Sequence, residues 1–178
     1  TLFRSEDGYV LTNAHVVAGT QRVALDTVLG VKPAEVVLYD PDTDIAVLRA
    51  DQLGLPALRW AGGELTPGGD AMIMGYPKSG PFEAAPVRIR GKLEIAGPDI
   101  YTTGRVEREA YTIRGNIRQG NSGGPLLTPD GAVAGMIFGA SLDTSETGYA
   151  LTAHQVQQRV GDVRSLRGPA DTQACVSG

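Results

Sequence analysis

Residues 119–126 read Gln-Gly-Asn-Ser-Gly-Gly-Pro-Leu, and this segment decides between the folds that the rest of the chain could form. Glycines on both sides of Ser122 allow a tight backbone turn that directs the N–H groups of Gly120 and Ser122 into one hollow. Such a hollow stabilises the negative oxygen that forms when a hydroxyl attacks a carbonyl carbon. We therefore predict that Ser122 is a nucleophile and that Gly120, Asn121 and Ser122 surround its oxyanion hole.

The pattern Gly-x-Ser-x-Gly also fits the nucleophile elbow of α/β-hydrolases, and Asp143 and His154 follow Ser122 in the order that such esterases use. An elbow requires a helix directly after the serine. Here the turn 129–131 (Pro-Asp-Gly) and an apolar run follow instead, so that no helix fits. The segment therefore favours a β-protein over an esterase.

Short runs of alternating apolar and polar residues indicate strands, and 24 glycines and 11 prolines are scattered between them. Their spacing of about ten residues is typical of sandwiches and barrels. One helix is predicted, because residues 152–155 (Thr-Ala-His-Gln) have the form of a capping box and Val156, Val160 and Val163 follow at helical spacing. The predicted strands are 8–12, 22–26, 35–39, 45–49, 71–75, 87–95, 110–113, 132–138 and 149–152.

Two further clusters contain the partners that a nucleophilic serine needs. His15 directly follows an apolar strand, and Asn13 and Gly19 are suited to begin and end a short helical turn around it. Asp44 abuts the buried run 45–49, where a carboxylate requires a hydrogen-bond donor, whereas the acidic residues at 40 and 42 are assigned to a solvated turn. An imidazole N–H is such a donor. We predict a triad in which Asp44 orients His15 and His15 takes the proton of Ser122.

Residues 12–17, 44–48 and 120–126 resemble the three catalytic segments of trypsin-like and HtrA-like serine proteases, in the same order. Residues 97–101, 111–114 and 146–152 are similar to the actinobacterial acid-resistance membrane serine proteases. The resemblance implies an all-β, trypsin-like fold of two six-stranded antiparallel β-barrels with a C-terminal helix. It also implies a periplasmic domain that cleaves polypeptides and that N-terminal membrane helices tether in the full protein.

The Gly- and Pro-rich stretch 61–69 is the predicted boundary between the two barrels. We expect the first barrel over 1–62, a linker over 63–69, the second barrel over 70–152, a helix over 153–165 and a tail over 166–178. Residues 1–4 resemble the end of the first barrel strand, so that part of this strand is expected to precede Thr1. The tail is polar, and we expect it to be loosely held unless Cys175 pins it.

Cys175 is the only cysteine in the chain and therefore has no partner here. From the residues alone, it is either an incidental exposed thiol or one half of a disulfide whose partner lies upstream in an oxidising compartment. In the family that the chain resembles, a cysteine before the protease domain pairs with one at this position, which favours the disulfide.

The chain has 20 acidic and 16 basic residues, a net charge of −4 and no Lys/Arg-rich run. Neither nucleic acid nor an anionic membrane surface is therefore expected as a partner. No stretch reaches the roughly 18–20 apolar residues of a membrane span. We expect a monomeric domain that binds a polypeptide substrate and needs no cofactor and no metal.

Trypsin-like enzymes place the floor of the primary specificity pocket six residues before the nucleophile, where this chain has Asn116. Because this floor carries no carboxylate, we expect medium-sized apolar or neutral side chains at the cleaved position rather than Arg or Lys. Zymogens of the trypsin type have an aspartate at the position of Asn121, so activation by N-terminal cleavage is not expected. The predicted pocket walls are Ile137, Phe138, Gly139, Ala140, Gly148 and Tyr149.

Two alternatives keep the same barrels. A pseudoprotease would bind peptides without cleaving them, although all three catalytic residue types are present. An HtrA-type quality-control protease shares the chemistry but usually continues into a PDZ domain, and no such domain follows the predicted helix in this chain.

Overall fold

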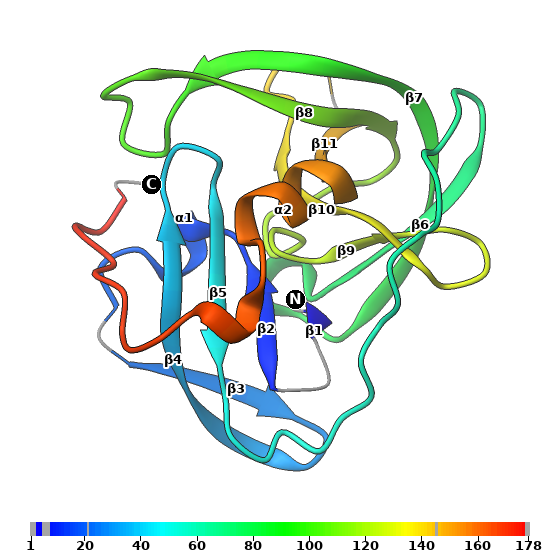
Figure 1. The fold of residues 1–178 in the computed structure, drawn as a ribbon. Helices are drawn as coiled ribbons and strands as arrows, with labels where there is room; N and C mark the ends of the chain where they lie inside the picture. Colours follow the sequence, from blue (N-terminus) through cyan, green and yellow to red (C-terminus); the bar gives the residue numbers. More distant parts are fainter. Residues whose placement is uncertain (1–2, 5–7, 21, 145, 177–178) are drawn as a thin grey trace.

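The protein is built on two antiparallel β-sheet structures (Figure 1). A computed structural model describes residues 3–4, 8–20, 22–144 and 146–176. The first half is a five-stranded sheet in the order β1-β2-β5-β4-β3. The second half is a closed six-stranded barrel in the order β10-β11-β8-β7-β6-β9. The predicted all-β, trypsin-like architecture with a short C-terminal helix is confirmed.

The elements follow one another in a simple order along the chain. The first half contains β1 (Phe3–Arg4), β2 (Tyr9–Thr12), α1 (Ala14–Val17), β3 (Val23–Thr27), β4 (Gly30–Asp40) and β5 (Ile45–Arg49). The second half contains β6 (Asp70–Gly75), η1 (Pro77–Ser79), β7 (Glu83–Pro98), β8 (Arg105–Arg114), β9 (Pro125–Leu127), β10 (Val133–Ala140) and β11 (Thr147–Thr152). The chain then continues into α2 (Ala153–Val160) and the turn η2 (Val163–Ser165).

The first half differs from the expected six-stranded barrel. In the described residues it has five strands, and the first of them, β1, has two residues. The connection to the second half contacts the second barrel through Trp60, which bridges to Val133, and through Leu65, whose N–H donates to the Tyr111 hydroxyl. The linker 63–69 stays a prediction.

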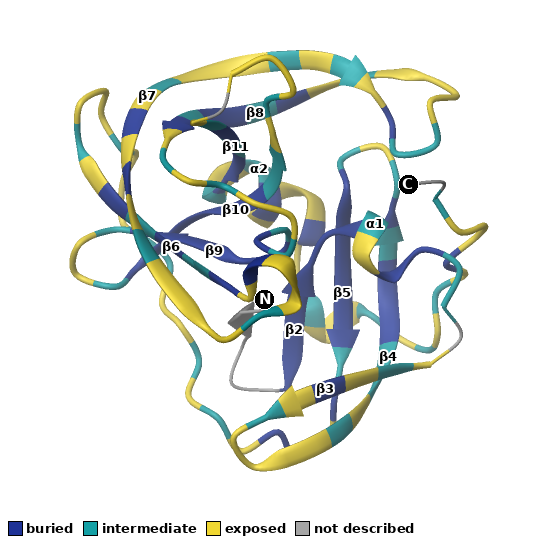
Figure 2. Ribbon diagram, turned by 180° about the vertical axis from the view of Figure 1, so that it is seen from behind, coloured by how far each residue is buried: buried dark blue, intermediate teal, exposed yellow. Residues whose placement is uncertain are grey.

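A shared apolar core holds the two halves together. Its residues come from β2, β4 and β5 of the first half, from β9, β10 and β11 of the second, and from α2. Burial of each large apolar side chain contributes roughly 1.5–3 kcal/mol, so this cluster fixes how the halves sit against each other. Buried residues therefore follow β2 and β5, whereas much of β7 is exposed (Figure 2).

The C-terminal helix α2 begins where the capping pattern places it. The Thr152 side chain accepts a hydrogen bond from Gln155 N at 3.0 Å, which satisfies one free N–H of the first turn. The Gln155 side chain does not complete the capping box, because its Oε1 accepts from Glu109 N instead. The helix ends before Gly161, which has a positive φ of 60°, so the predicted helix 153–165 is divided into α2 and η2. No described helix has the length and apolar character of a membrane span.

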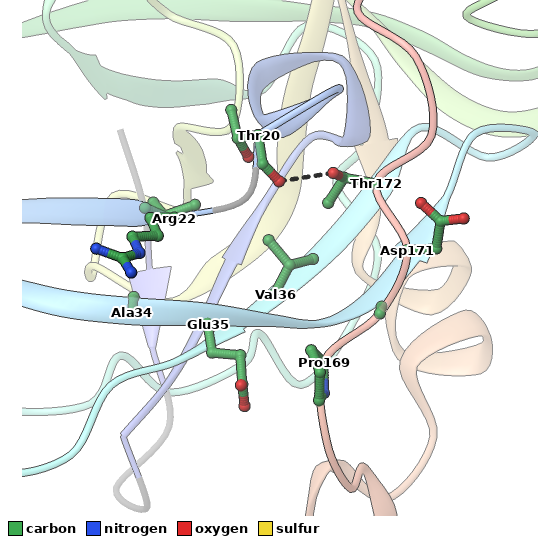
Figure 3. Close-up of a pocket in the computed structure, with 10 residues that line it drawn as sticks. Thr20, Arg22, Ala34, Glu35, Val36, Pro169, Asp171 and Thr172 are labelled. Carbon is green, nitrogen blue, oxygen red and sulfur yellow. Dashed lines mark hydrogen bonds between the residues drawn. The ribbon is translucent and has the colours of Figure 1, made fainter.

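The tail is docked on the first half, contrary to the expectation that it is loosely held. Ala170 N donates to Val36 O at 2.7 Å, and Gly19 N donates to Thr172 O at 2.9 Å. The Thr172 hydroxyl donates to Thr20 O, as Figure 3 shows beside a groove of about 490 Å³ between the tail, β3 and β4. These partners are main-chain groups, which a polar sequence pattern does not reveal.

The loop between β4 and β5 is held from within and from α2. The Asp40 side chain accepts hydrogen bonds from the N–H of Asp42, from the N–H and hydroxyl of Thr43, and from the Arg159 guanidinium. Burial by itself would raise the pKa of Asp40, but the bonds from Thr43 and Arg159 outweigh it and hold the pKa below its ordinary value. Asp40 is buried, so its assignment to a solvated turn is wrong.

The substitution Asp40→Asn tests whether the Asp40 charge stabilises the loop between β4 and β5. A carboxyl group whose pKa falls on folding stabilises the native state above its unfolded pKa of about 3.9, and this stabilisation is lost as the pH drops through the lower native pKa. We expect Asp40→Asn to lower the free energy of unfolding by about 1–3 kcal/mol at neutral pH. The deficit should shrink below about pH 3.9.

Urea unfolding across this pH range measures the effect, with the exposed Asp51→Asn as the control. A deficit that is constant with pH would show that the Asp40 charge is not responsible.

Candidate active site

His15 and Asp44 form a two-point contact, as the predicted triad requires. His15 Nδ1 lies 2.7 Å from Asp44 Oδ2, and the His15 main-chain N–H donates to Asp44 Oδ1 at 2.9 Å. An ionised carboxylate only accepts hydrogen bonds, so this contact selects the imidazole tautomer that carries its proton on Nδ1. In that tautomer Nε2 has a lone pair and can accept a proton. The His15 side chain is 30% exposed and that of Asp44 is 5% exposed, so the base is accessible and its partner is not.

Asn13 holds the aspartate in place, a function that the sequence analysis did not foresee. Its side chain does not cap α1, and its Nδ2 instead donates to the main-chain oxygen of Asp44 at 2.9 Å. Asp44 has a positive φ of 61°, a conformation that costs a non-glycine residue about 1–3 kcal/mol. Bonds from Asn13 and His15 to both the backbone and the carboxylate offset this strain. The segment 13–15, which follows β2, thus directs the polar groups of Asn13 and His15 towards Asp44.

The turn that carries Ser122 is braced by Asn121. The N–H of Arg118 donates to Asn121 Oδ1 at 2.9 Å, and the N–H of Asn121 donates to Arg118 O at 3.0 Å. Asn121 therefore offers no donor to the predicted oxyanion hole that it adjoins, because its N–H already has an acceptor. Within the described residues, the N–H groups of Gly120 and Ser122 have no acceptor, which leaves them available.

The turn η1 sets the orientation of the Gly120 N–H. Lys78 N donates to Gln119 O at 2.7 Å, and Tyr76 N donates to Gly120 O at 3.4 Å. In a trans peptide the C=O of residue 119 and the N–H of residue 120 point in opposite directions, so the bond from Lys78 also fixes the Gly120 donor. Gly120 has a φ of 95°, and a Cβ at this position would lie 2.3 Å from Tyr76 O. Glycine is therefore required there.

The structure does not join Ser122 to His15 by a hydrogen bond. In the described part of the chain, the Ser122 hydroxyl has no recorded partner, and the histidine pairs only with Asp44. Hydrogen bonds between a nucleophile and its base are often long without substrate and tighten when substrate binds. The triad therefore stays a prediction at its Ser122 end.

The predicted pocket residues fall into two groups. Gly139 pairs with Tyr149 and Ala140 with Gly148, after an irregularity in β10 that follows Ile137, so these walls are neighbouring strands. The predicted floor residue, Asn116, is exposed, and its Oδ1 accepts from Arg118 Nε at 2.9 Å, so the floor stays a prediction.

Ile117, which the sequence analysis did not select, lies against one of these walls. A Cβ on Gly148 would come within 2.6 Å of Ile117 Cγ1. Ile117 also packs against the core of the second barrel. In the sequence, Ile117 could have been identified only by its β-branched side chain and its position directly after the predicted floor residue.

The groove beneath the tail contains none of the predicted site residues. Nor does any described group of three or more His, Cys, Asp or Glu side chains have an arrangement suited to a metal ion. The groups of the candidate site are an imidazole, a carboxylate, a hydroxyl and main-chain donors.

Known proteins resemble this chain over most of its length. The trypsin-like peptidase domain family matches residues 2–136. Serine protease Rv3671c of Mycobacterium tuberculosis (strain ATCC 25618 / H37Rv) is 44% identical over 171 residues, which are 94% of this chain and 42% of the relative. A probable periplasmic serine endoprotease, DegP-like, of Chlamydia pneumoniae is 35% identical over 74% of this chain and 26% of the relative. The chain thus spans less than half the length of these relatives.

Solved structures show the same likeness. The active form of the Rv3671c protease from M. tuberculosis superposes with a TM-score of 0.95 at 42% identity, covering 99% of this chain and 78% of that chain. An inactive form of the Rv3671c protease superposes with a TM-score of 0.83 at 42% identity, covering 91% of this chain and 82% of that chain. HtrA-type protease AlgW with a decapeptide superposes with a TM-score of 0.75 at 25% identity, covering 91% of this chain and 50% of that chain. With its barrel fold, its imidazole–carboxylate pair and these relatives, the chain belongs to the trypsin-like peptidase family and is a serine protease domain.

Proposed function

We propose that this domain is an active endopeptidase in which Ser122, His15 and Asp44 form the catalytic triad. The observation that carries the proposal is the two-point contact between His15 and Asp44, which places the imidazole proton on Nδ1. A histidine held in this way is prepared to act as a general base through Nε2. The greater structural overlap with the active than with the inactive form of the Rv3671c protease supports it further.

The proposed reaction has two stages. His15 Nε2 takes the hydroxyl proton of Ser122 while the Ser122 oxygen attacks the scissile carbonyl carbon, and Asp44 stabilises the imidazolium that forms. The N–H groups of Gly120 and Ser122 bind the oxyanion. The imidazolium then protonates the departing amine, which leaves an acyl-enzyme on Ser122. Water attacks this ester with His15 again as the base, which releases the acid and restores the hydroxyl.

The cellular setting is part of the same proposal. We propose a monomeric, extracytoplasmic protease domain that is membrane-anchored in a longer protein and acts in resistance to stress or acid. The support is the resemblance to the acid-resistance membrane proteases and a relative that is named periplasmic. Cys175 is exposed, and a Cβ added at Gly19 would lie 2.3 Å from its Sγ. A disulfide from Cys175 to a cysteine outside this chain would therefore join the tail beside α1.

A peptide-binding pseudoprotease is the second candidate, because it would have the same fold. The esterase alternative is wrong, because strand β9 (Pro125–Leu127), not a helix, follows the Ser122 turn in a β-barrel. A test of covalent chemistry at Ser122 separates the two remaining candidates.

Ser122→Ala should abolish labelling by a fluorophosphonate probe and lower peptide hydrolysis by about 10⁴-fold or more. His15→Ala should do the same, because the serine then lacks its base. His154→Ala is the matched control, since this exposed histidine lies on α2 and should retain full activity. A parent protein that neither reacts with the probe nor cleaves peptides would establish the pseudoprotease.

The same site should prefer medium-sized apolar or neutral side chains at the cleaved position. The predicted floor offers the amide of Asn116 instead of a carboxylate, and Ile117 contacts the wall at Gly148. We expect a peptide-library profile without Arg or Lys selection, and Ile117→Ala should shift the profile towards larger apolar residues. A profile dominated by basic residues, or one that Ile117→Ala leaves unchanged, would contradict this assignment of the pocket.

A further inference from the structure

Arg108 on β8 is a buried cation that no part of the proposed mechanism uses. The residue is 5% exposed, although arginine is almost never fully buried without a paired anion. Its three hydrogen bonds all go to main-chain carbonyl groups: Nη2 donates to Asp42 O at 2.6 Å, and both Nη atoms donate to Pro98 O at 3.1 Å. Arg108 Nε is buried and has no partner.

A contribution to stability alone does not explain this arrangement, because burial of the Arg108 charge costs free energy of folding. Burial lowers the pKa of Arg108, while the carboxylates of Asp44, Asp40, Asp99 and Asp42 act in the opposite direction. Replacement of buried charges by apolar side chains of similar volume is often neutral or stabilising in other proteins. A function in the protein's activity would explain why a charge occupies this position.

The position of the guanidinium suggests that function. Arg108 belongs to the second half, and its shortest hydrogen bond reaches Asp42 of the first half, two residues before Asp44. The guanidinium carbon lies 5.9 Å from the ring centre of Phe138 on β10. Nearby, Ile100 N donates to Pro41 O at 3.3 Å. The loop that ends in Asp44 is thus tied to the second barrel, to which Ser122 belongs.

We propose that Arg108 is a positioning residue: it holds the Asp44 loop, and through the loop the geometry of the His15–Asp44 bond, so that His15 faces Ser122 across the interface between the two halves. It acts through the Asp42 carbonyl and touches no reacting atom. The proposal rests on the triad proposed above. Its physical basis is that displacement of a catalytic group by about 1 Å can cost roughly 10²-fold in rate.

The experiment compares Arg108→Met, Arg108→Gln and the parent protein. Met fills the volume without charge or donors, and Gln keeps one amide donor for a carbonyl group. Arg105→Met is the matched control, because Arg105 lies on the same strand, is exposed and loses the same charge. The readouts are kcat and KM on one peptide substrate, and the downfield proton resonance of His15 Nδ1–H, which reports directly on the bond to Asp44. Circular dichroism confirms folding.

We expect Arg108→Met to lower kcat by about 10- to 100-fold with KM within about two-fold, and to shift or broaden the His15 resonance. Arg108→Gln should be intermediate, and Arg105→Met should match the parent. If Arg108→Met does not fold, Arg108→Gln is judged by the same two criteria.

A folded variant with the parent's kcat, or one with a lower kcat but an unchanged His15 resonance, would overturn the proposal. Failure of the proposed function is recognised separately, because the parent itself would then show no turnover and no fluorophosphonate labelling. The His15 resonance decides the positioning function of Arg108 in that case as well, since it requires no catalysis.

Discussion

The hydrogen bonds from His15 to the Asp44 carboxylate are the interaction on which the candidate site depends, because they set the tautomer of the base and the direction of its free nitrogen. Asp44 meets this demand in a strained, buried conformation. The surroundings hold it there: Asn13 binds its backbone, and Asp40 organises the loop before it. The polar groups around the His15–Asp44 pair thus stabilise a backbone conformation of Asp44 that is unfavourable by itself.

The proposed nucleophile and its proposed main-chain donors are held by a second set of contacts in the other half. Asn121 closes the turn before Ser122, and the N–H of Lys78 orients the peptide whose N–H belongs to Gly120. Each half therefore prepares its own part of the site. Catalysis requires the two parts to lie close together. The shared apolar core, helix α2 and Arg108 determine how the two halves are placed relative to each other.

Much of the local structure could be predicted from the sequence. Alternating runs located most strands, Thr152 located the start of α2, and the strand after Ser122 excluded an elbow. One residue was misassigned for a physical reason. Asn13 was expected to cap α1 with its side chain, yet an amide can donate or accept in several directions, and its Nδ2 binds the Asp44 main-chain oxygen instead. Which partner it takes depends on the backbone groups that folding brings close.

By itself, the sequence determined the all-β fold class, because strand periodicity, turn residues and caps are local properties, and it predicted the residues of the proposed chemistry. Only the tertiary structure decided that Asp40 is buried and that the tail binds the segment after α1. It also decided that a guanidinium from β8 reaches the Asp44 loop, a contact between residues 66 positions apart. Such contacts are decided by how the two halves pack, since burial forces each polar group to find a partner and the packed backbone determines which partner is within reach.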